Sequence, residues 1–189
     1  MLQYLKRSMF IVCCTLTFVN CKGQSNNKDF DLFLSKFADF ELPANPTELL
    51  AERERKGDFQ KIKILRKDYD EFLREKGDTY WSFNEPFEYS YIGKNNFDNY
   101  WILLYYRGFL CDDVNLQKSE IVLSTFTLDG RIISSLPIAG GYGDSLTFSS
   151  VINSVIDINV KYTLYQNDKE NTYTKQYFVG DGYVLKIRN

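Results

Sequence analysis

Two cysteines stand where a thiol could do chemistry. Cys21 ends an apolar run and opens the polar stretch CKGQSNNKD, whereas Cys111 is followed directly by Asp112 and Asp113. A nucleophilic cysteine needs a base or a positive neighbour that favours its thiolate, and adjacent carboxylates do the opposite. The chain contains no histidine, which removes the usual general base and the commonest metal ligand. We therefore expect Cys111 to lie in a loop between two strands without a catalytic role.

The stretch AGGYGDS (139–145) contains three glycines that could cradle a phosphate. It lacks the lysine of a P-loop and the G-x-G-x-x-G spacing, and strand-like sequence flanks it instead of a helix, so it predicts a hairpin loop. Carboxylates are numerous enough for a glycosidase-type acid and nucleophile, but no spacing selects two of them. The sequence thus predicts no catalytic residue, no cofactor and no metal ligand.

Aromatic residues are the unusual part of the composition, with 14 Tyr, 15 Phe and 2 Trp. Six of them fall in YWSFNEPFEYSY (80–91), which could form an exposed platform for a glycan or peptide, or could fill the core between a sheet and helices. Residues 51–67 carry seven basic and three acidic side chains, which could meet anionic lipid or form a solvated helix face. The formal net charge of −2 argues against nucleic acid as a partner.

The first residues have the order of a secretory signal. MLQYLKR carries two positive charges, and the 13 residues of SMFIVCCTLTFVN are mostly apolar. As a helix this run would reach roughly 20 Å, which is shorter than the ~30 Å hydrocarbon core of a bilayer. No small-residue cleavage site of ordinary secretion precedes Cys21, because Phe18, Val19 and Asn20 stand there. The sequence predicts a signal peptide over residues 1–20.

This layout resembles that of bacterial lipoproteins, and CKGQ after the run looks like small uncharacterised Bacteroidetes-type lipoproteins. LDGRIISSLPIAGGYGD (128–144) is also similar to them. The resemblance implies acylation of Cys21 as the first mature residue. It also implies an outer-membrane location, because Lys22 rather than Asp follows the cysteine, and a periplasmic orientation. Without acylation, Cys21 and Cys111 could pair in an oxidising compartment.

Together these features predict a lipid-anchored, non-enzymatic binding or interaction module of the bacterial outer membrane that faces the periplasm. Its expected partners are the bilayer, through acylated Cys21, and an envelope protein or a glycan. The alternatives are a carboxylate-based glycan hydrolase and a structural or inhibitory envelope component.

Residues 21–28 read as the lipidated cysteine and a flexible spacer, and residues 29–189 as one domain. Phe30, Phe33, Leu34 and Phe37 have helical spacing and predict a first helix that ends at LPANP (42–46). A second helix is expected from about Glu48 to Lys56. Residues 59–76 favour a third helix, although KIKIL also alternates like a strand.

After Gly77 the apolar pattern changes to a period of two. It predicts strands over residues 87–94, 100–107, 119–128, 131–138, 145–152, 155–165, 173–180 and 183–187. Asp129-Gly130 and Asp181-Gly182 are typical hairpin turns. The short connections favour neighbouring antiparallel strands. The predicted fold class is α+β, with N-terminal helices followed by an antiparallel β-meander of about seven or eight strands.

Overall fold

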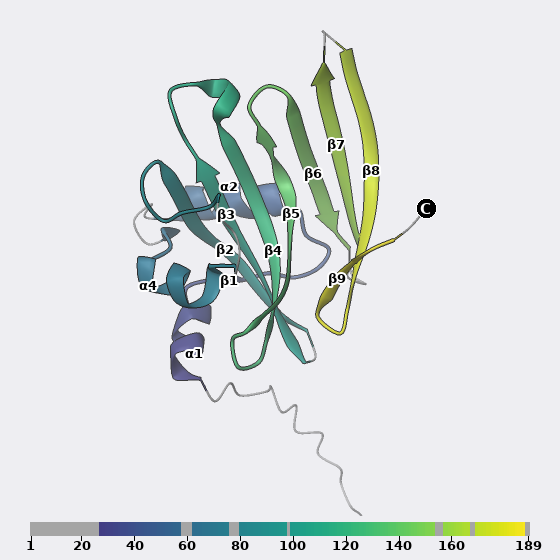
Figure 1. Cartoon of the computed structure of the whole chain (residues 1–189). Coiled ribbons are helices and arrows are strands. Elements are labelled where there is room, and N and C mark those ends of the chain that lie inside the picture. The colour runs from purple at the N-terminus through teal and green to yellow at the C-terminus, as the bar shows by residue number, and fades with distance from the viewer. Residues whose placement is uncertain are drawn as a thin grey trace, which may run out of the picture.

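The computed structural model describes residues 27–57, 62–75, 80–97, 99–153, 157–166 and 169–187. Within them the fold is dominated by a nine-stranded sheet whose strands follow one another in chain order (Figure 1). The predicted signal peptide, Cys21 and nearly all of the spacer lie outside the described residues. The strands are β1 (Ala38–Asp39), β2 (Phe87–Phe97), β3 (Tyr100–Phe109), β4 (Lys118–Thr127), β5 (Ile132–Tyr142), β6 (Leu146–Ile152), β7 (Asp157–Gln166), β8 (Lys169–Gly180) and β9 (Tyr183–Lys186).

Strands β2 to β9 pair antiparallel with their neighbours, and each of the eight predicted strands has its counterpart among them. The added strand is β1, which pairs parallel with β2 and places Ala38 opposite Gly93. The sheet is therefore mixed, and the predicted meander of seven or eight strands describes only its antiparallel part.

The first predicted helix is shorter than expected, whereas the second begins at Pro46, slightly before its expected start at Glu48. The described helices are α1 (Lys28–Leu34), α2 (Pro46–Lys56), α4 (Arg66–Asp68), the π-helix η1 (Tyr69–Leu73) and the 3₁₀-helix η2 (Val114–Leu116). The side chain of Asn27 caps α1 by accepting from the backbone N–H groups of Asp29 and Phe30. Asn45 caps α2 in the same way, and α2 ends at Lys56 as predicted.

Two expectations for the helical region were wrong in extent. Helix α1 ends at Leu34, well before LPANP, although Phe37 beyond it is still buried. Among the described residues of the predicted third helix, Ile62 and residues 66–73 are helical. Between them the chain is extended, since Lys63 forms an antiparallel bridge with Ser90 of β2 and Leu65 has extended backbone angles. The strand-like alternation of KIKIL therefore has a counterpart at Lys63, while Lys61 lies outside the described residues.

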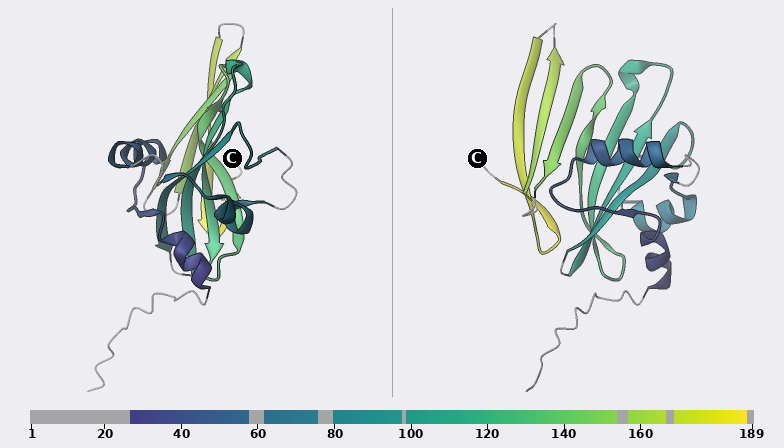
Figure 2. Two further views of the ribbon diagram at one scale, coloured as in Figure 1. Left: turned by 90° about the vertical axis from the view of Figure 1, so that its left-hand side faces the viewer. Right: turned by 180° about the vertical axis from the view of Figure 1, so that it is seen from behind.

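Helices cover both faces of the sheet, with α2 on one side and α4 on the other (Figure 2). The fold has two hydrophobic cores, and alternate residues of β3 belong to each. Ile102 and Leu104 belong to the core against which α2 packs, which we call the α2-side core. Leu103 and Tyr105 belong to the core that contains the buried residues of α1, which we call the α1-side core. Each is almost fully buried, and burying one such side chain stabilises the fold by about 1.5–3 kcal/mol. In the α1-side core, the ring of Phe33 stacks on that of Phe72 at 4.6 Å between centroids.

A buried polar network ties the helices of the α1-side core to β2. Asp68 is only 5% exposed; Lys36 Nζ lies 2.5 Å from its carboxylate, and the hydroxyl of Tyr91 donates to the same oxygen. Burial and this hydrogen bond raise the pKa of Tyr91. The network fixes the approach of α4 to the sheet, because each of its buried polar groups has a partner.

The start of the described chain and the far end of β5 lie at opposite ends of the sheet. Asn27 Nδ2 donates to the backbone carbonyl of Asp129, at 3.3 Å, in the β4–β5 hairpin. Along β5, Ile132 and Tyr142 are separated by roughly 30 Å at the usual rise of about 3.3 Å per residue.

The two hairpin turns have the backbone conformation that the sequence predicts. Gly130 has a φ of +93° in the β4–β5 turn, and Asp181 and Gly182 have φ values of +51° and +82° in the β8–β9 turn. Both predicted hairpin turns are thus confirmed.

Candidate binding surface

Four aromatic side chains form a row across neighbouring strands, and we call Tyr142, Phe148, Tyr162 and Tyr173 the aromatic strip. They come from β5, β6, β7 and β8. Phe148 is directly opposite Tyr162, and Tyr162 is directly opposite Tyr173. Directly paired residues project from the same face of a sheet, so the register alone brings these rings together.

The rings of the aromatic strip are in contact. Their centroids are 5.7 Å apart for Tyr142 and Phe148, 5.6 Å for Phe148 and Tyr162, and 5.0 Å for Tyr162 and Tyr173. The last two pairs are nearly parallel, at 21° and 9°, which is an offset-stacked arrangement. Phe148 is buried, Tyr142 and Tyr162 are half-buried, and Tyr173 is 39% exposed. The strip therefore becomes more accessible toward β8.

Two lysines lie over the rings. Lys118 Nζ is 3.9 Å from the ring centroid of Tyr80 and 5.4 Å from that of Tyr142. Lys175 Nζ is 4.8 Å from the centroid of Tyr162 and 5.4 Å from that of Tyr173. Positive charges over ring faces are favourable electrostatic contacts. Both ends of the strip thus carry positive charge.

A buried ion pair holds the β5 end of the strip in place. Arg107 Nε lies 2.6 Å from a carboxylate oxygen of Glu120, and the hydroxyl of Tyr142 donates to the other oxygen. Arg107 also lies over the ring of Trp81 at 4.5 Å and 4.0 Å from the carboxylate of Glu75. Burial and the hydrogen bond to Glu120 raise the pKa of Tyr142. The Tyr142 hydroxyl is therefore a fixed, neutral donor that orients its ring.

A groove of about 350 Å³ lies beside Lys118 and is also lined by Gly140, Gly141 and Gly143. Gly140 has a φ of +144°, and a Cβ there would lie 1.9 Å from the carbonyl oxygen of Ser119. Only glycine allows β5 to approach β4 this closely. The stretch 139–145 forms a hairpin as predicted, but residues 139–142 belong to β5.

Most aromatic residues of the stretch 80–91 belong to the core. Tyr89 and Tyr91 are buried, and Trp81, Phe83 and Phe87 pack against the α1-side core. Tyr80 is 41% exposed. The core interpretation therefore holds for most of this stretch.

The aromatic strip was missed in the sequence. Its four members lie in four strands, and no local cluster marks them. The signal that could have found them is the register, which the hairpins between β5 and β8 determine.

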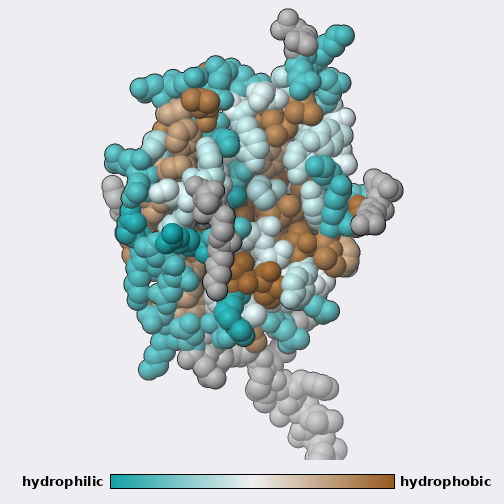
Figure 3. Space-filling model, in the orientation of Figure 1, coloured by the Kyte–Doolittle hydropathy of each residue, from teal (hydrophilic) through white to brown (hydrophobic). Residues whose placement is uncertain are grey.

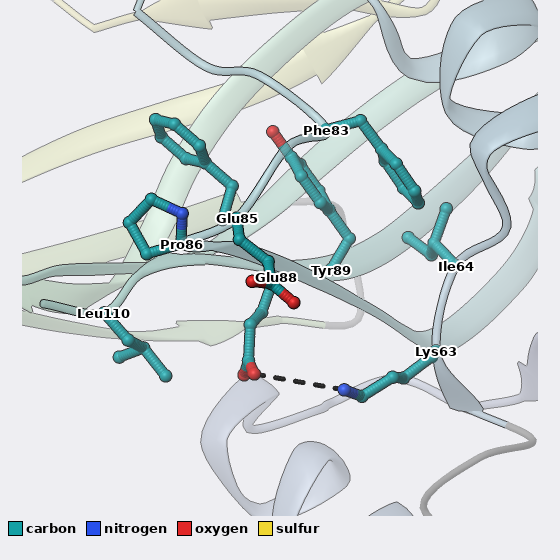
Figure 4. Close-up of a pocket in the computed structure, with 9 residues that line it drawn as sticks. Lys63, Ile64, Phe83, Glu85, Pro86, Glu88, Tyr89 and Leu110 are labelled. Carbon is teal, nitrogen blue, oxygen red and sulfur yellow. Dashed lines mark ion pairs between the residues drawn. The ribbon is translucent and has the colours of Figure 1, made fainter.

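A second cavity, of about 480 Å³, lies near the start of β2 (Figure 4). The rings of Phe83 and Tyr89 lie on one side of it, and Lys63 Nζ is 3.9 Å from the carboxylate of Glu88. Glu85 and Glu88 are both exposed. Solvent-exposed carboxylates lack the desolvation that prepares a general acid, so this cavity gives little support to acid–base catalysis.

The basic run 51–67 does not form one solvated face. Arg53, Arg55 and Lys56 belong to α2, whereas Lys63 and Lys67 lie beyond it and pair with Glu88 and Asp29. Lys56 pairs with Glu52 one turn earlier. Residues 58–61 lie outside the described residues. The local positive excess is therefore partly neutralised within the fold.

Cys111 lies in the β3–β4 loop, as predicted, where its thiol donates to the backbone carbonyl of Asp113 at 3.2 Å. The described residues contain no group of three or more acidic or thiol side chains placed to hold a metal ion. None of the described helices has the length and apolar character that a membrane span requires. In comparisons with known proteins, no family model matches the chain, and no curated protein or solved structure matches it.

Proposed function

We propose that this protein is a non-enzymatic glycan-binding module and that the aromatic strip is its binding surface. The observation that carries the proposal is the continuous row of rings from Tyr142 to Tyr173, half-buried or exposed at three of its four positions. Sugar rings present C–H groups that pack on aromatic faces, while tyrosine hydroxyls donate to sugar oxygens. The surface view over β5 to β9 alternates between hydrophobic and polar patches (Figure 3), which suits a ligand that has both characters.

The proposal includes an anchor at acylated Cys21 on the outer membrane, with the module in the periplasm. The position of Asn27 supports it, since this residue lies against Asp129 at the opposite end of β5 from Tyr142. A chain tethered before Asn27 would thus leave the aromatic strip roughly 30 Å from the attachment point of the tether. Such a module can hold a glycan without steric conflict with the bilayer.

Carboxylate-based hydrolysis is the second candidate, because the carboxylates of Glu75 and Glu120 both lie near Arg107, at 4.0 and 2.6 Å from its guanidinium nitrogens. Two carboxylates flanking a sugar are the usual arrangement for glycoside cleavage. Glu120 is nevertheless 4% exposed, and both of its oxygens accept hydrogen bonds from Arg107 and Tyr142. These contacts favour a structural carboxylate, so binding without cleavage is the better-supported function.

A glycan microarray probed with the purified protein tests the proposal. We expect selective binding to a class of oligosaccharides, and we expect Tyr162→Ala to abolish it. Tyr165→Ala is the matched control, since Tyr165 is 45% exposed on the same strand but on the other face by alternation. Analysis of the bound sugars for shorter products distinguishes hydrolysis from binding. Absence of any sugar binding would refute the proposal and leave an envelope protein as the partner to seek.

A further inference from the structure

We infer that the ligand is an acidic oligosaccharide, whose negative groups meet Lys118 at one end of the aromatic strip and Lys175 at the other. This inference rests on the proposed function and specifies its ligand class. Lys118 is on β4 and Lys175 on β8, so the two positive charges are separated by four strand spacings, roughly 20 Å. A ligand that reaches both must therefore contain several sugar units.

The first observation is the environment of the two lysines. Both are half-buried, whereas Lys161 of β7, Lys169 of β8 and Lys186 of β9 are exposed. Among the described residues, neither Lys118 nor Lys175 lies within ion-pair distance of a carboxylate. A partly desolvated ammonium without an anionic partner gains from binding an external anion.

The contrast with other lysines supports this point. Lys36 pairs with Asp68, and Lys67 pairs with Asp29. These lysines have structural partners within the fold. Lys118 and Lys175 contact ring faces instead, and such contacts leave the hydrogen-bonding capacity of the ammonium available to a ligand.

The second observation is the position of the Lys118 ammonium. It lies over the rings of Tyr80 and Tyr142, 3.9 and 5.4 Å from their centroids, so it stays on the face of the sheet that carries the aromatic strip. The groove of about 350 Å³ that the backbone of Lys118 borders lies on the other face, because its lining residues Ser119 and Thr147 alternate with Lys118 and Phe148.

The acidic residues near the strip do not oppose an anionic ligand strongly. Glu120 is buried and its charge is paired with Arg107. Glu170 of β8 accepts from the hydroxyl of Thr172, and alternation places both on the face opposite Tyr173 and Lys175. The face of β8 that carries the strip therefore has a positive rather than a negative side chain beside the exposed ring.

The test compares acidic oligosaccharides with neutral ones of the same backbone and length. Separate series of ligands carry uronate, sulfate or phosphate as the acidic group. Affinities are measured by calorimetry for the wild-type protein, for Lys118→Gln and for Lys175→Gln. We expect a preference for the acidic member that weakens with added salt, and each variant should lose about tenfold in affinity for it, equivalent to about 1.4 kcal/mol. Binding of the neutral member should stay nearly unchanged.

Lys161→Gln is the matched control, because Lys161 is exposed and lies on the other face of β7 from Tyr162. Equal binding of acidic and neutral sugars, or a preference that survives both lysine variants, would overturn the inference while leaving the glycan-binding proposal intact. Failure to bind any sugar would overturn both. Thermal unfolding of each variant verifies that a loss of binding does not come from a loss of folding.

Discussion

The rings of Tyr162 and Tyr173 lie 9° from parallel with their centroids 5.0 Å apart. Lys175 lies over both rings. Strand β9 pairs with β8 only from Tyr177 to Gly180, so within the described residues no paired strand lies beyond Tyr173. A stack that is packed at Phe148 and exposed at Tyr173 has an accessible end, and this end is where we expect the ligand to make its first contacts.

Removal of the Tyr142 hydroxyl tests whether the buried pair of Arg107 and Glu120 holds the ring of Tyr142 in place. In Tyr142→Phe, Glu120 loses the hydrogen bond from this ring, and we expect a loss of about 1–3 kcal/mol in the free energy of unfolding. Sugar affinity should also fall, because the ring is no longer fixed. Tyr165→Phe, at an exposed position, should change neither quantity. Urea denaturation and calorimetry measure the two effects, and unchanged stability in Tyr142→Phe would contradict this role.

The ion pair between Arg107 and Glu120 should behave as a buried pair. Their side chains are 11% and 5% exposed, so Arg107→Met leaves a buried carboxylate without its cation, which costs about 3–5 kcal/mol. The double variant Arg107→Met/Glu120→Leu should recover much of that loss. Lys67→Met removes an exposed, solvent-screened pair with Asp29 and should cost far less than the loss of the buried pair. Urea denaturation measures these losses. Similar losses for the exposed and buried pairs would contradict the burial of the pair of Arg107 and Glu120.

Stability should fall at alkaline pH because of the buried tyrosines. Burial raises the pKa of Tyr105 to about 12, and burial also raises the pKa of Tyr89, Tyr91 and Tyr162. Tyrosines in the unfolded chain ionise near pH 10, so the stabilisation is complete below that pH. As the pH rises from about 10 to 12, the unfolded chain loses protons that the folded chain retains, and the free energy of unfolding decreases.

The absorbance of tyrosinate measures this effect directly. Titration of the folded protein should leave a group of tyrosines protonated beyond pH 10, and they should ionise together when the protein unfolds. Ionisation of all tyrosines at one pH, without unfolding, would contradict the burial described for these side chains.

The intact mass of the protein purified from membranes tests the anchor. We expect a chain that begins at Cys21 and carries two or three acyl chains, since each buried methylene contributes about 0.8 kcal/mol to membrane binding. Cys21→Ser should appear in the soluble fraction, and an inhibitor of lipoprotein processing should block the mass change. A soluble, unmodified wild-type protein would contradict the anchor and reopen a disulfide between Cys21 and Cys111.

Strand positions could be predicted from the sequence because alternation is local. The alternating pattern in residues 157–166 predicts a strand without reference to the rest of the chain. The Asp181-Gly182 pair likewise predicts a turn from two residues alone. Helix α1 was overextended because Phe37 keeps the helical spacing although the helix has ended. Its ring packs in T-shaped contacts with Phe33 and Tyr91, so a tertiary contact produced a pattern typical of a helix.

The binding surface required information that one strand does not contain. Tyr142 and Tyr173 are 31 positions apart in the sequence, and only the registers of three successive hairpins place them in one row. The dense aromatic cluster at 80–91 was the more visible signal, yet Tyr89 and Tyr91 are core residues. Local aromatic density therefore indicated the core, while dispersed aromatic residues formed the accessible row.

The most direct measurement of the central claim is a calorimetric titration of the oligosaccharide selected by the array into wild-type protein, Tyr173→Ala and Tyr165→Ala. Tyr173 is the exposed end of the stack, and an aromatic contact of this kind contributes about 0.5–1.5 kcal/mol beyond the buried area. We predict that Tyr173→Ala weakens binding by about tenfold and that Tyr165→Ala binds as the wild type does. Equal affinities for all three proteins would contradict the assignment of the aromatic strip as the binding surface.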